Sequence, residues 1–244
     1  MNIKVIPCKE ALLFYINFYA KENPYLLYII YLLNKDLAMK LKNIHNLDLN
    51  NLDIEEDLIL LASVFEEKFK EYFNRALPLF KKAFNIEKIP ERLVVLAYPL
   101  LNEELLGLAK IIKGDPVIII GLNEKEEKRI IAVFLHEILH ILFELNNIEL
   151  PPKFCEALLD YFVPNGLISL KLGLIDQNVF EYKIQSKLKR KSPRAKDDEY
   201  FYYFKNLLPL RNYDFSTDVW SWILKNVKDE KIKAIVKNLV KTEK

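Results

Sequence analysis

The run from Val133 to Leu142 constrains this chain more than any other stretch of its sequence. It is apolar apart from three residues, and it contains two of the three histidines in the protein, His136 and His140, with Glu137 between them. No glycine or proline interrupts it, so the pattern predicts a buried helix. Because residues four apart lie on one face of a helix, with Cβ atoms about 5–6 Å apart, both imidazoles are expected on the same side.

Two imidazoles placed in this way can bind one Zn²⁺, each at roughly 2.0–2.1 Å. Glu137 is turned about 100° around the helix axis from His136, so its carboxylate can miss the metal and still reach a metal-bound water. This is the His-Glu-x-x-His motif, in which the glutamate is a general base. The alternative is a core helix with two satisfied histidines. We prefer the metal site because these groups, buried without a metal, would leave costly unpaired polar atoms.

A catalytic zinc site has three protein ligands and one position for water, so a second element has to supply the third ligand. The helix expected after Pro151-Pro152 carries Glu156 and Asp160 on one face of an otherwise apolar segment. Glu156 can bind the metal, and Asp160 can accept a hydrogen bond from a ligating imidazole. Glu144 competes from the face of the histidines, but its short side chain would have to turn back along the helix. We therefore expect Glu156 to be the third ligand.

On these residues the sequence resembles the gluzincin metallopeptidases. Their pattern is His-Glu-x-x-His on one helix and a glutamate on a following helix, often as Glu-x-x-x-Asp. The resemblance implies a zincin-like fold, a Zn²⁺ cofactor and a peptide or protein substrate whose carbonyl is attacked by a zinc-activated water. The resemblance implies that Glu137 is the general base and that the metal ligands are His136, His140 and Glu156. Asp160 would contact a ligating imidazole without binding the metal.

Residues near and after the motif indicate which classes of zinc peptidase the chain can resemble. Metzincins would need a glycine in place of Phe143 and a histidine in place of Asn146, so that class is excluded. Gluzincins often steady the transition state with a later histidine or tyrosine. Because no histidine follows His140, Tyr200 or Tyr203 would have to serve here.

Two other classes of function stay open at this point. In one, a related peptidase module cleaves or senses a repressor within a regulatory protein; a helix-turn-helix would support this, and none is clear. In the other, the chain is a catalytically inactive metal-binding scaffold, which the presence of Glu137 disfavours.

Composition sets the class of protein. With 244 residues, 51% of them hydrophobic and 29% charged, the chain is expected to be soluble and globular, with an ample core. A formal net charge of +2 predicts no general affinity for nucleic acid. Cys8 and Cys155 form no disulfide framework, which suits a cytoplasmic protein with reduced thiols. The apolar runs 11–20 and 24–33 are too short for the roughly 20 residues of a membrane span, so no transmembrane segment is expected.

The expected fold is α+β and predominantly helical, with a zincin-like region at 90–244 and a helical N-terminal region at 1–89 packed on it. Residues 7–43 are predicted to be helical. Apolar side chains at helical spacing then predict a helix from about residue 54 that Pro78 ends or kinks. These N-terminal helices are expected to be structural, or alternatively to restrain the site.

A small sheet is expected directly before the metal helix. Residues 92–98 predict one strand, and 106–112 with 116–121 predict a hairpin. Asn123 is expected to cap the helix that follows, and a nearby sheet edge suits an extended peptide. The basic stretch 181–196 is interpreted as a solvated loop, with an anionic partner as the alternative. Later helices are expected at 197–208, at 216–227 and onward to about residue 240.

Overall fold

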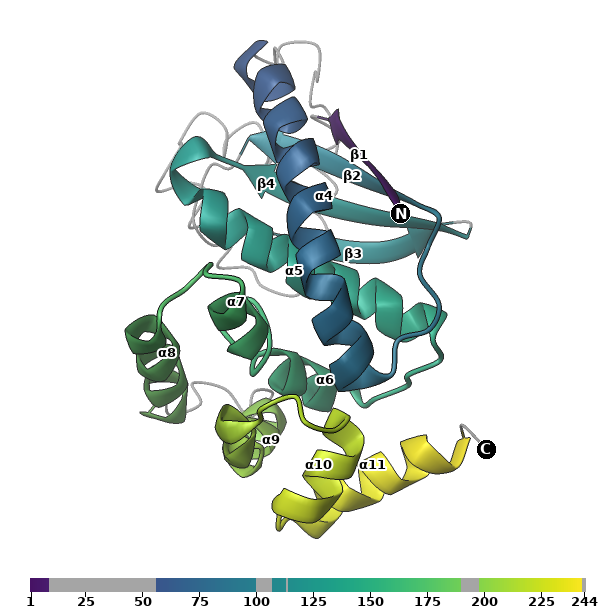
Figure 1. The fold of residues 1–244 in the computed structure, drawn as a ribbon, viewed down its shortest axis with the longest axis vertical. Helices are drawn as coiled ribbons and strands as arrows, with labels where there is room; N and C mark the ends of the chain where they lie inside the picture. The colour runs from purple at the N-terminus through teal and green to yellow at the C-terminus, as the bar shows by residue number, and fades with distance from the viewer. Residues whose placement is uncertain (9–55, 100–106, 113, 190–197, 243–244) are drawn as a thin grey trace, which may run out of the picture. The chain divides into compact units, whose positions relative to one another are not determined.

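The structure is a computed structural model that describes residues 1–8, 56–99, 107–112, 114–189 and 198–242 (Figure 1). It is a mixed α/β chain, mostly helical, with one small four-stranded sheet. The chain forms two compact units: Met1–Lys70 with Glu91–Ile130, and Glu71–Pro90 with Ile131–Lys244. The regions 1–89 and 90–244 are a different division, which stays a prediction.

The first unit contains the sheet, whose strands lie in the order β1-β2-β4-β3. β1 is parallel to β2, β2 is parallel to β4, and β3 is antiparallel to β4. The expected strand and hairpin are therefore confirmed, whereas β1 was not foreseen. The strands are β1 (Asn2–Pro7), β2 (Arg92–Pro99), β3 (Gly107–Ile112) and β4 (Asp115–Leu122).

Local chemistry explains the hairpin. Gly114 has a φ of 87° in the turn between β3 and β4, a left-handed conformation that glycine adopts without strain. On the other side of β4 lies β2, and a side chain links these two strands. Nη2 of Arg92 in β2 donates hydrogen bonds to both carboxylate oxygens of Asp115 in β4, at 2.7 and 2.8 Å. β4 itself is buried along most of its length.

The main chain of β1 is also held by a side chain of α4 (Glu56–Phe84). The amide of Val5 donates to Oε2 of Glu66 at 3.0 Å, and Glu66 pairs with Lys70 at 2.9 Å and with Lys4 at 3.3 Å. Burial raises the pKa of Glu66, but these hydrogen bonds outweigh it and leave the pKa below its ordinary value. Glu66 therefore occupies the edge of β1 as a carboxylate.

α4 confirms the predicted apolar stripe, with its phenylalanines in the core. The helix does not end at Pro78, as one reading of the sequence predicted, but continues to Phe84. Pro78 lies on the exposed side and removes one main-chain hydrogen bond, while burial of Phe80 and Phe84 beyond it stabilises the last turns. The predicted helix of residues 7–43 falls mostly outside the described residues, and Pro7 itself belongs to β1.

The second unit is helical around an aromatic core. Phe84 is fully buried, and its ring centroid lies 5.1 Å from Phe143, 4.8 Å from Phe162 and 6.0 Å from Trp220. The expected late helices are confirmed. Part of the basic stretch, residues 181–189, is helix and not loop. The helices after α5 (Glu127–Leu145) are α6 (Pro152–Leu159), α7 (Leu167–Lys171), α8 (Gln177–Lys189), α9 (Asp198–Asn206), α10 (Val219–Asn226) and α11 (Glu230–Thr242).

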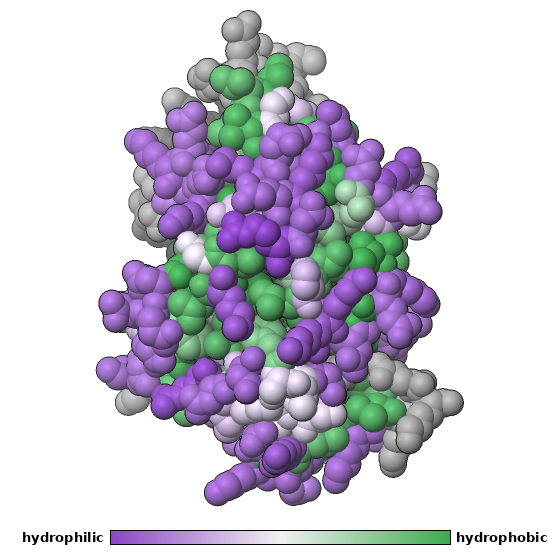
Figure 2. Space-filling model, viewed as in Figure 1, coloured by the Kyte–Doolittle hydropathy of each residue, from purple (hydrophilic) through white to green (hydrophobic). Residues whose placement is uncertain are grey.

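Hydrophilic side chains cover much of the face drawn in Figure 2, with hydrophobic ones between them. Among the described helices, none combines the length and the apolar character that crossing a bilayer would require. Cys8 and Cys155 form no disulfide.

Candidate metal centre

The helix that carries both histidines, α5, begins and ends with local signals in its sequence. The side chain of Asn123 accepts a hydrogen bond from the amide of Lys125 at 2.9 Å, and the 3₁₀ turn Glu124–Glu126 leads directly into α5. The predicted cap is therefore confirmed. At the other end Asn147 adopts a φ of 55°, and the amide of Ile148 returns to the carbonyl of Phe143 at 2.9 Å. Such a left-handed residue is a common helix stop.

Both histidines lie on one face of α5, as their spacing predicts. Their rings meet edge to face with centroids 4.8 Å apart, and the two Nε2 atoms are separated by 3.1 Å. The side chains are only 14% exposed for His136 and 27% for His140, and residues 137–139 between them are buried. The two imidazole nitrogens are therefore directed together at one edge of a buried helix.

α6 supplies the third side chain of the cluster, the carboxylate of Glu156. Glu156 places its carboxylate oxygens 3.5 Å from Nε2 of His136 and 3.3 Å from Nε2 of His140. These three residues form a cluster that could hold a metal ion, and all of them belong to the second unit. Glu144, the competing carboxylate, is exposed and is not a member of this cluster. The expected grouping of His136, His140 and Glu156 is confirmed.

The separations within the cluster test whether a metal ion fits. Ligands held at roughly 2.0–2.1 Å from a tetrahedral ion lie about 3.3–3.4 Å from one another. The two Nε2 atoms are 3.1 Å apart, and each lies 3.3–3.5 Å from a different oxygen of Glu156. With one donor atom taken from each residue, all three lie within 4.8 Å of one another, close enough to share one ion. Two imidazole nitrogens and one carboxylate are also a donor set that suits zinc and other divalent transition metals. The residues present therefore fit a bound metal ion.

The remaining ring nitrogens have partners that orient the imidazoles. Nδ1 of His136 faces the carbonyl of Val163 at 3.3 Å, and Nδ1 of His140 faces Sγ of Cys155 at 4.0 Å. A carbonyl accepts from Nδ1–H, so Nδ1 of His136 keeps its proton and Nε2 is the ring nitrogen that faces the cluster and could bind a metal after losing its own proton. Sequence reasoning did not identify Val163, because no side-chain pattern marks a main-chain acceptor.

The two histidines of the metal-free cluster differ in pKa, so they are not protonated to the same extent. Burial would lower the pKa of His136, but the hydrogen bond to Glu156 and the charge of Glu137 outweigh it and raise the pKa to about 9. Burial and the charge of His136 lower the pKa of His140 to about 4. Burial would raise the pKa of Glu156, but His136 overcomes this effect and lowers it. The site therefore holds a carboxylate and a single proton at neutral pH.

Glu137 is one of the few buried charged residues, at 9% exposed. It follows His136 on α5, and its charge contributes to the raised pKa of that histidine, so the carboxylate lies near the cluster. It is absent from the cluster itself. This is the arrangement that the sequence predicts for a group that acts beside a metal and does not bind it.

The two tyrosines named as candidates for steadying a transition state differ in position. The hydroxyl of Tyr203 donates to Glu199 at 3.0 Å, and its ring packs against Phe154. The hydroxyl of Tyr200 donates to Asp160. Burial and the charges of nearby carboxylates raise the pKa of Tyr200. The charge of Glu156 is among the causes of that shift in the pKa of Tyr200, and the role of either residue stays a prediction.

Asp160 has other partners than the predicted imidazole. Its carboxylate accepts from Tyr200 and forms an ion pair with Lys187 of α8. Its charge nevertheless contributes to the raised pKa of His136, so Asp160 lies near the centre. A hydrogen bond from a ligating imidazole to Asp160 stays a prediction.

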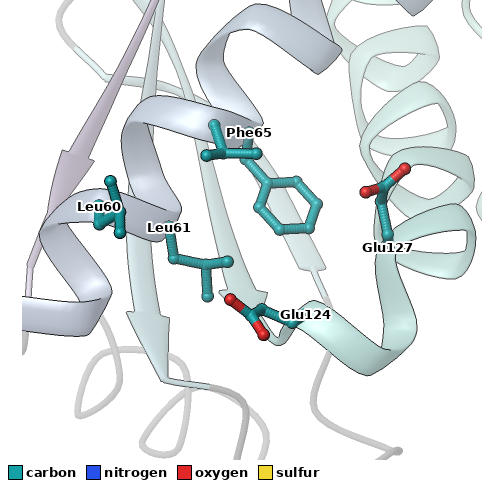
Figure 3. A pocket seen from close by; sticks show the side chains of 6 residues that line it. Leu60, Leu61, Phe65, Glu124 and Glu127 are labelled. Carbon is teal, nitrogen blue, oxygen red and sulfur yellow. The ribbon is translucent and has the colours of Figure 1, made fainter.

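A separate pocket of about 540 Å³ lies in the first unit, between α4 and the turn before α5 (Figure 3). Leu60, Leu61 and Phe65 form its apolar wall, and Glu124 and Glu127 border it. Glu127 is paired with Lys68 at 3.0 Å. None of the predicted site residues lines this pocket.

No family model, curated protein or solved structure matches this chain. The donor geometry is therefore the observation on which the metal centre rests.

Proposed function

We propose that this protein is a zinc-dependent peptidase with a zincin-like catalytic region, in which His136, His140 and Glu156 hold the metal and Glu137 is the general base. The cluster of two imidazole nitrogens and one carboxylate, close enough together to share one metal ion, carries the proposal. The gluzincin resemblance over the same residues supports hydrolysis of a peptide or protein substrate.

A bound zinc ion supplies a Lewis acid and a water molecule whose pKa is lowered toward neutrality. His136 and His140 would bind it through Nε2, since their Nδ1 atoms face Val163 and Cys155. Glu156 would be the third ligand, supplied by α6, a different helix.

Glu137 handles the proton in this scheme. Its place on α5, about 100° around the axis from His136, keeps it off the metal and beside the position of the attacking water. Its carboxylate would accept a proton from the attacking water and would return that proton to the leaving amine. A positioned carboxylate contributes about 10²–10⁴-fold as a general base.

The substitution Glu137→Gln tests the proposal, because it removes the base and no metal ligand. The purified chain, loaded with one equivalent of zinc, is assayed on unfolded casein and on a mixed library of quenched fluorescent peptides. Glu137→Gln should bind zinc as the wild type does and lose at least about 100-fold in cleavage rate. Glu144→Gln is the matched control, since it makes the same change at an exposed position of the same helix and should leave cleavage unchanged.

Cleavage by Glu137→Gln at the wild-type rate would remove Glu137 from the mechanism. Binding of zinc by a wild type that cleaves neither substrate would favour the inactive metal-binding scaffold. Among the described residues, no observation favours that scaffold or a repressor-directed regulatory module over hydrolysis.

A further inference from the structure

Asp160 is tied to two helices beyond the metal cluster. It caps the C-terminal end of α6, one helical turn after Glu156. Its carboxylate accepts a hydrogen bond from the hydroxyl of Tyr200 on α9 and pairs with the ammonium of Lys187 on α8. One side chain therefore joins α6, α8 and α9 close to the third metal ligand.

α6 depends on such contacts for its position. It has only eight residues, and no side chain caps its first turn, so it is too short to be stable alone. α9 supplies apolar support, because Tyr161 stacks on Phe204 with centroids 4.6 Å apart, and the ring of Phe154 meets Tyr203 at 5.2 Å. Asp160 adds a polar contact to this apolar support, one helical turn after Glu156.

Lys187 is a partly enclosed cation that forms an ion pair with Asp160. Its side chain is 25% exposed and that of Asp160 is 15% exposed. Its Nζ lies 5.5 Å from the ring of Phe204 and 5.9 Å from the ring of Tyr200, so the aliphatic stem and the cation are enclosed by aromatic faces. Removing one partner of an enclosed ion pair leaves an uncompensated charge, which is more damaging than the loss of a surface pair.

We propose that Lys187 and Tyr200 are positioning residues of the metal centre: they hold Asp160, and through it they fix α6 so that Glu156 faces His136 and His140. This inference rests on the proposed metal site. It also gives one lysine of the basic stretch a specific partner within the chain, in place of solvent or an anionic ligand.

Zinc affinity tests this inference without any peptidase assay. Lys187→Met keeps most of the apolar stem and removes the charge, and Tyr200→Phe removes only the hydroxyl. Each variant should lose about 10–100-fold in zinc affinity, measured by competition with a chromophoric chelator, as changes around metal ligands typically do. The absorption bands of bound Co²⁺ should also shift, because the ligand geometry changes. Lys187→Arg preserves the ion pair and should restore affinity to near the wild-type value.

Two controls make comparable changes away from Asp160. Lys183→Met alters an exposed lysine one turn earlier on α8. Tyr202→Phe removes a hydroxyl on α9 that donates to Asp229 at 2.5 Å. Both controls should bind zinc like the wild type and give its Co²⁺ spectrum. Circular dichroism of the metal-free variants separates loss of the site from loss of the fold, and Tyr200→Phe decides the matter if Lys187→Met does not fold.

The zinc measurements distinguish failure of the positioning role from failure of the proposed metal site. Unchanged zinc affinity and an unchanged Co²⁺ spectrum in Lys187→Met and Tyr200→Phe would overturn the positioning role while the metal site stands. A wild-type chain that binds no zinc would overturn the metal site, and the positioning role with it.

Discussion

The Nε2 atoms of His136 and His140 lie 3.1 Å apart, and the pKa values of the two imidazoles are displaced in opposite directions. Two protonated imidazoles at this distance would repel each other strongly, so the metal-free pair holds one proton. The higher pKa, about 9, belongs to His136. A metal ion that binds Nε2 of His136 therefore has to displace that proton.

Zinc binding should release about one proton per site near neutral pH. Below pH 9 His136 is protonated without metal, so the apparent affinity should rise about tenfold per pH unit and become level above the pKa of about 9. His140, with a pKa of about 4, adds to this dependence only in acid. Calorimetry in buffers of different ionisation enthalpy counts the protons. An affinity that does not change with pH around neutrality would contradict the assignment.

Replacing the third ligand should be more damaging than replacing its competitor. Glu156→Ala removes the only carboxylate of the described cluster. It should lower zinc affinity by more than the roughly 10–100-fold that is typical when a residue contacting a metal ligand, and not the ligand itself, is replaced. Glu144→Ala alters an exposed residue and should leave affinity nearly intact. Asp160→Asn should fall between them, at about 10–100-fold. A zinc titration ranks the three variants, and the reverse order of Glu156 and Glu144 would overturn the gluzincin assignment.

Metal removal should destabilise the folded chain. A ligand that binds only the native state stabilises it by about 2.7 kcal/mol when its free concentration is 100 times the dissociation constant. A chelator should therefore lower the melting temperature of the zinc-loaded wild type. His140→Ala lacks one ligand, so its melting temperature should not respond to chelator. A response of equal size in both proteins would place the stabilising metal elsewhere.

Gly166 should tolerate no side chain. A Cβ atom at this position would overlap the main chain of Tyr161 and Phe162, which cannot move aside as a flexible side chain can. Gly166→Ala should therefore cost about 1–3 kcal/mol or more, measured by urea unfolding. It should also weaken zinc binding, because the same turn carries the Val163 carbonyl that faces His136. Gly114→Ala, in the first unit, should cost about 1 kcal/mol for its positive φ and leave zinc binding unchanged.

The aromatic core of the second unit should depend strongly on Phe84. Its fully buried ring contacts three other aromatic residues, so Phe84→Ala should lower the free energy of unfolding by about 3–5 kcal/mol. Tyr182 is a control, since its side chain is 69% exposed and Tyr182→Ala should change stability by no more than about 0.5 kcal/mol. Equal losses in the two variants, compared by urea unfolding, would contradict this account.

The parts of the site that could be predicted are those set by local geometry. The spacing of His136 and His140 fixes their common face within a single helix, and the Pro-Pro break with Glu156 marks a second helix a short distance along the chain. Val163 and Lys187 could not be found in this way. Their roles depend on where a turn and a distant helix come to lie, and neither position has a pattern of its own in the sequence.

The fold shows the same limit. The hairpin of β3 and β4 and the cap at Asn123 are signalled by neighbouring residues, so both were predicted. β1 was missed although Ile3 and Val5 alternate with polar residues, because the strand is short and its partner is far away in the sequence. The prediction that the helix could end at Pro78 was wrong, because burial of Phe80 and Phe84 outweighs the hydrogen bond that the proline removes.

The pairing of β1 with β2 has a consequence for how the chain folds during synthesis. Asn2 is in register with Arg92, so β1 is made about 90 residues before its partner strand. At roughly 5–20 residues per second, that interval lasts about 5–20 seconds. Glu66, which binds the amide of Val5, is made earlier than β2 but still 61 residues after Val5. Placing β1 also requires closing a long loop, so we expect the strand to join the sheet late, after the hairpin has formed from its own short-range contacts.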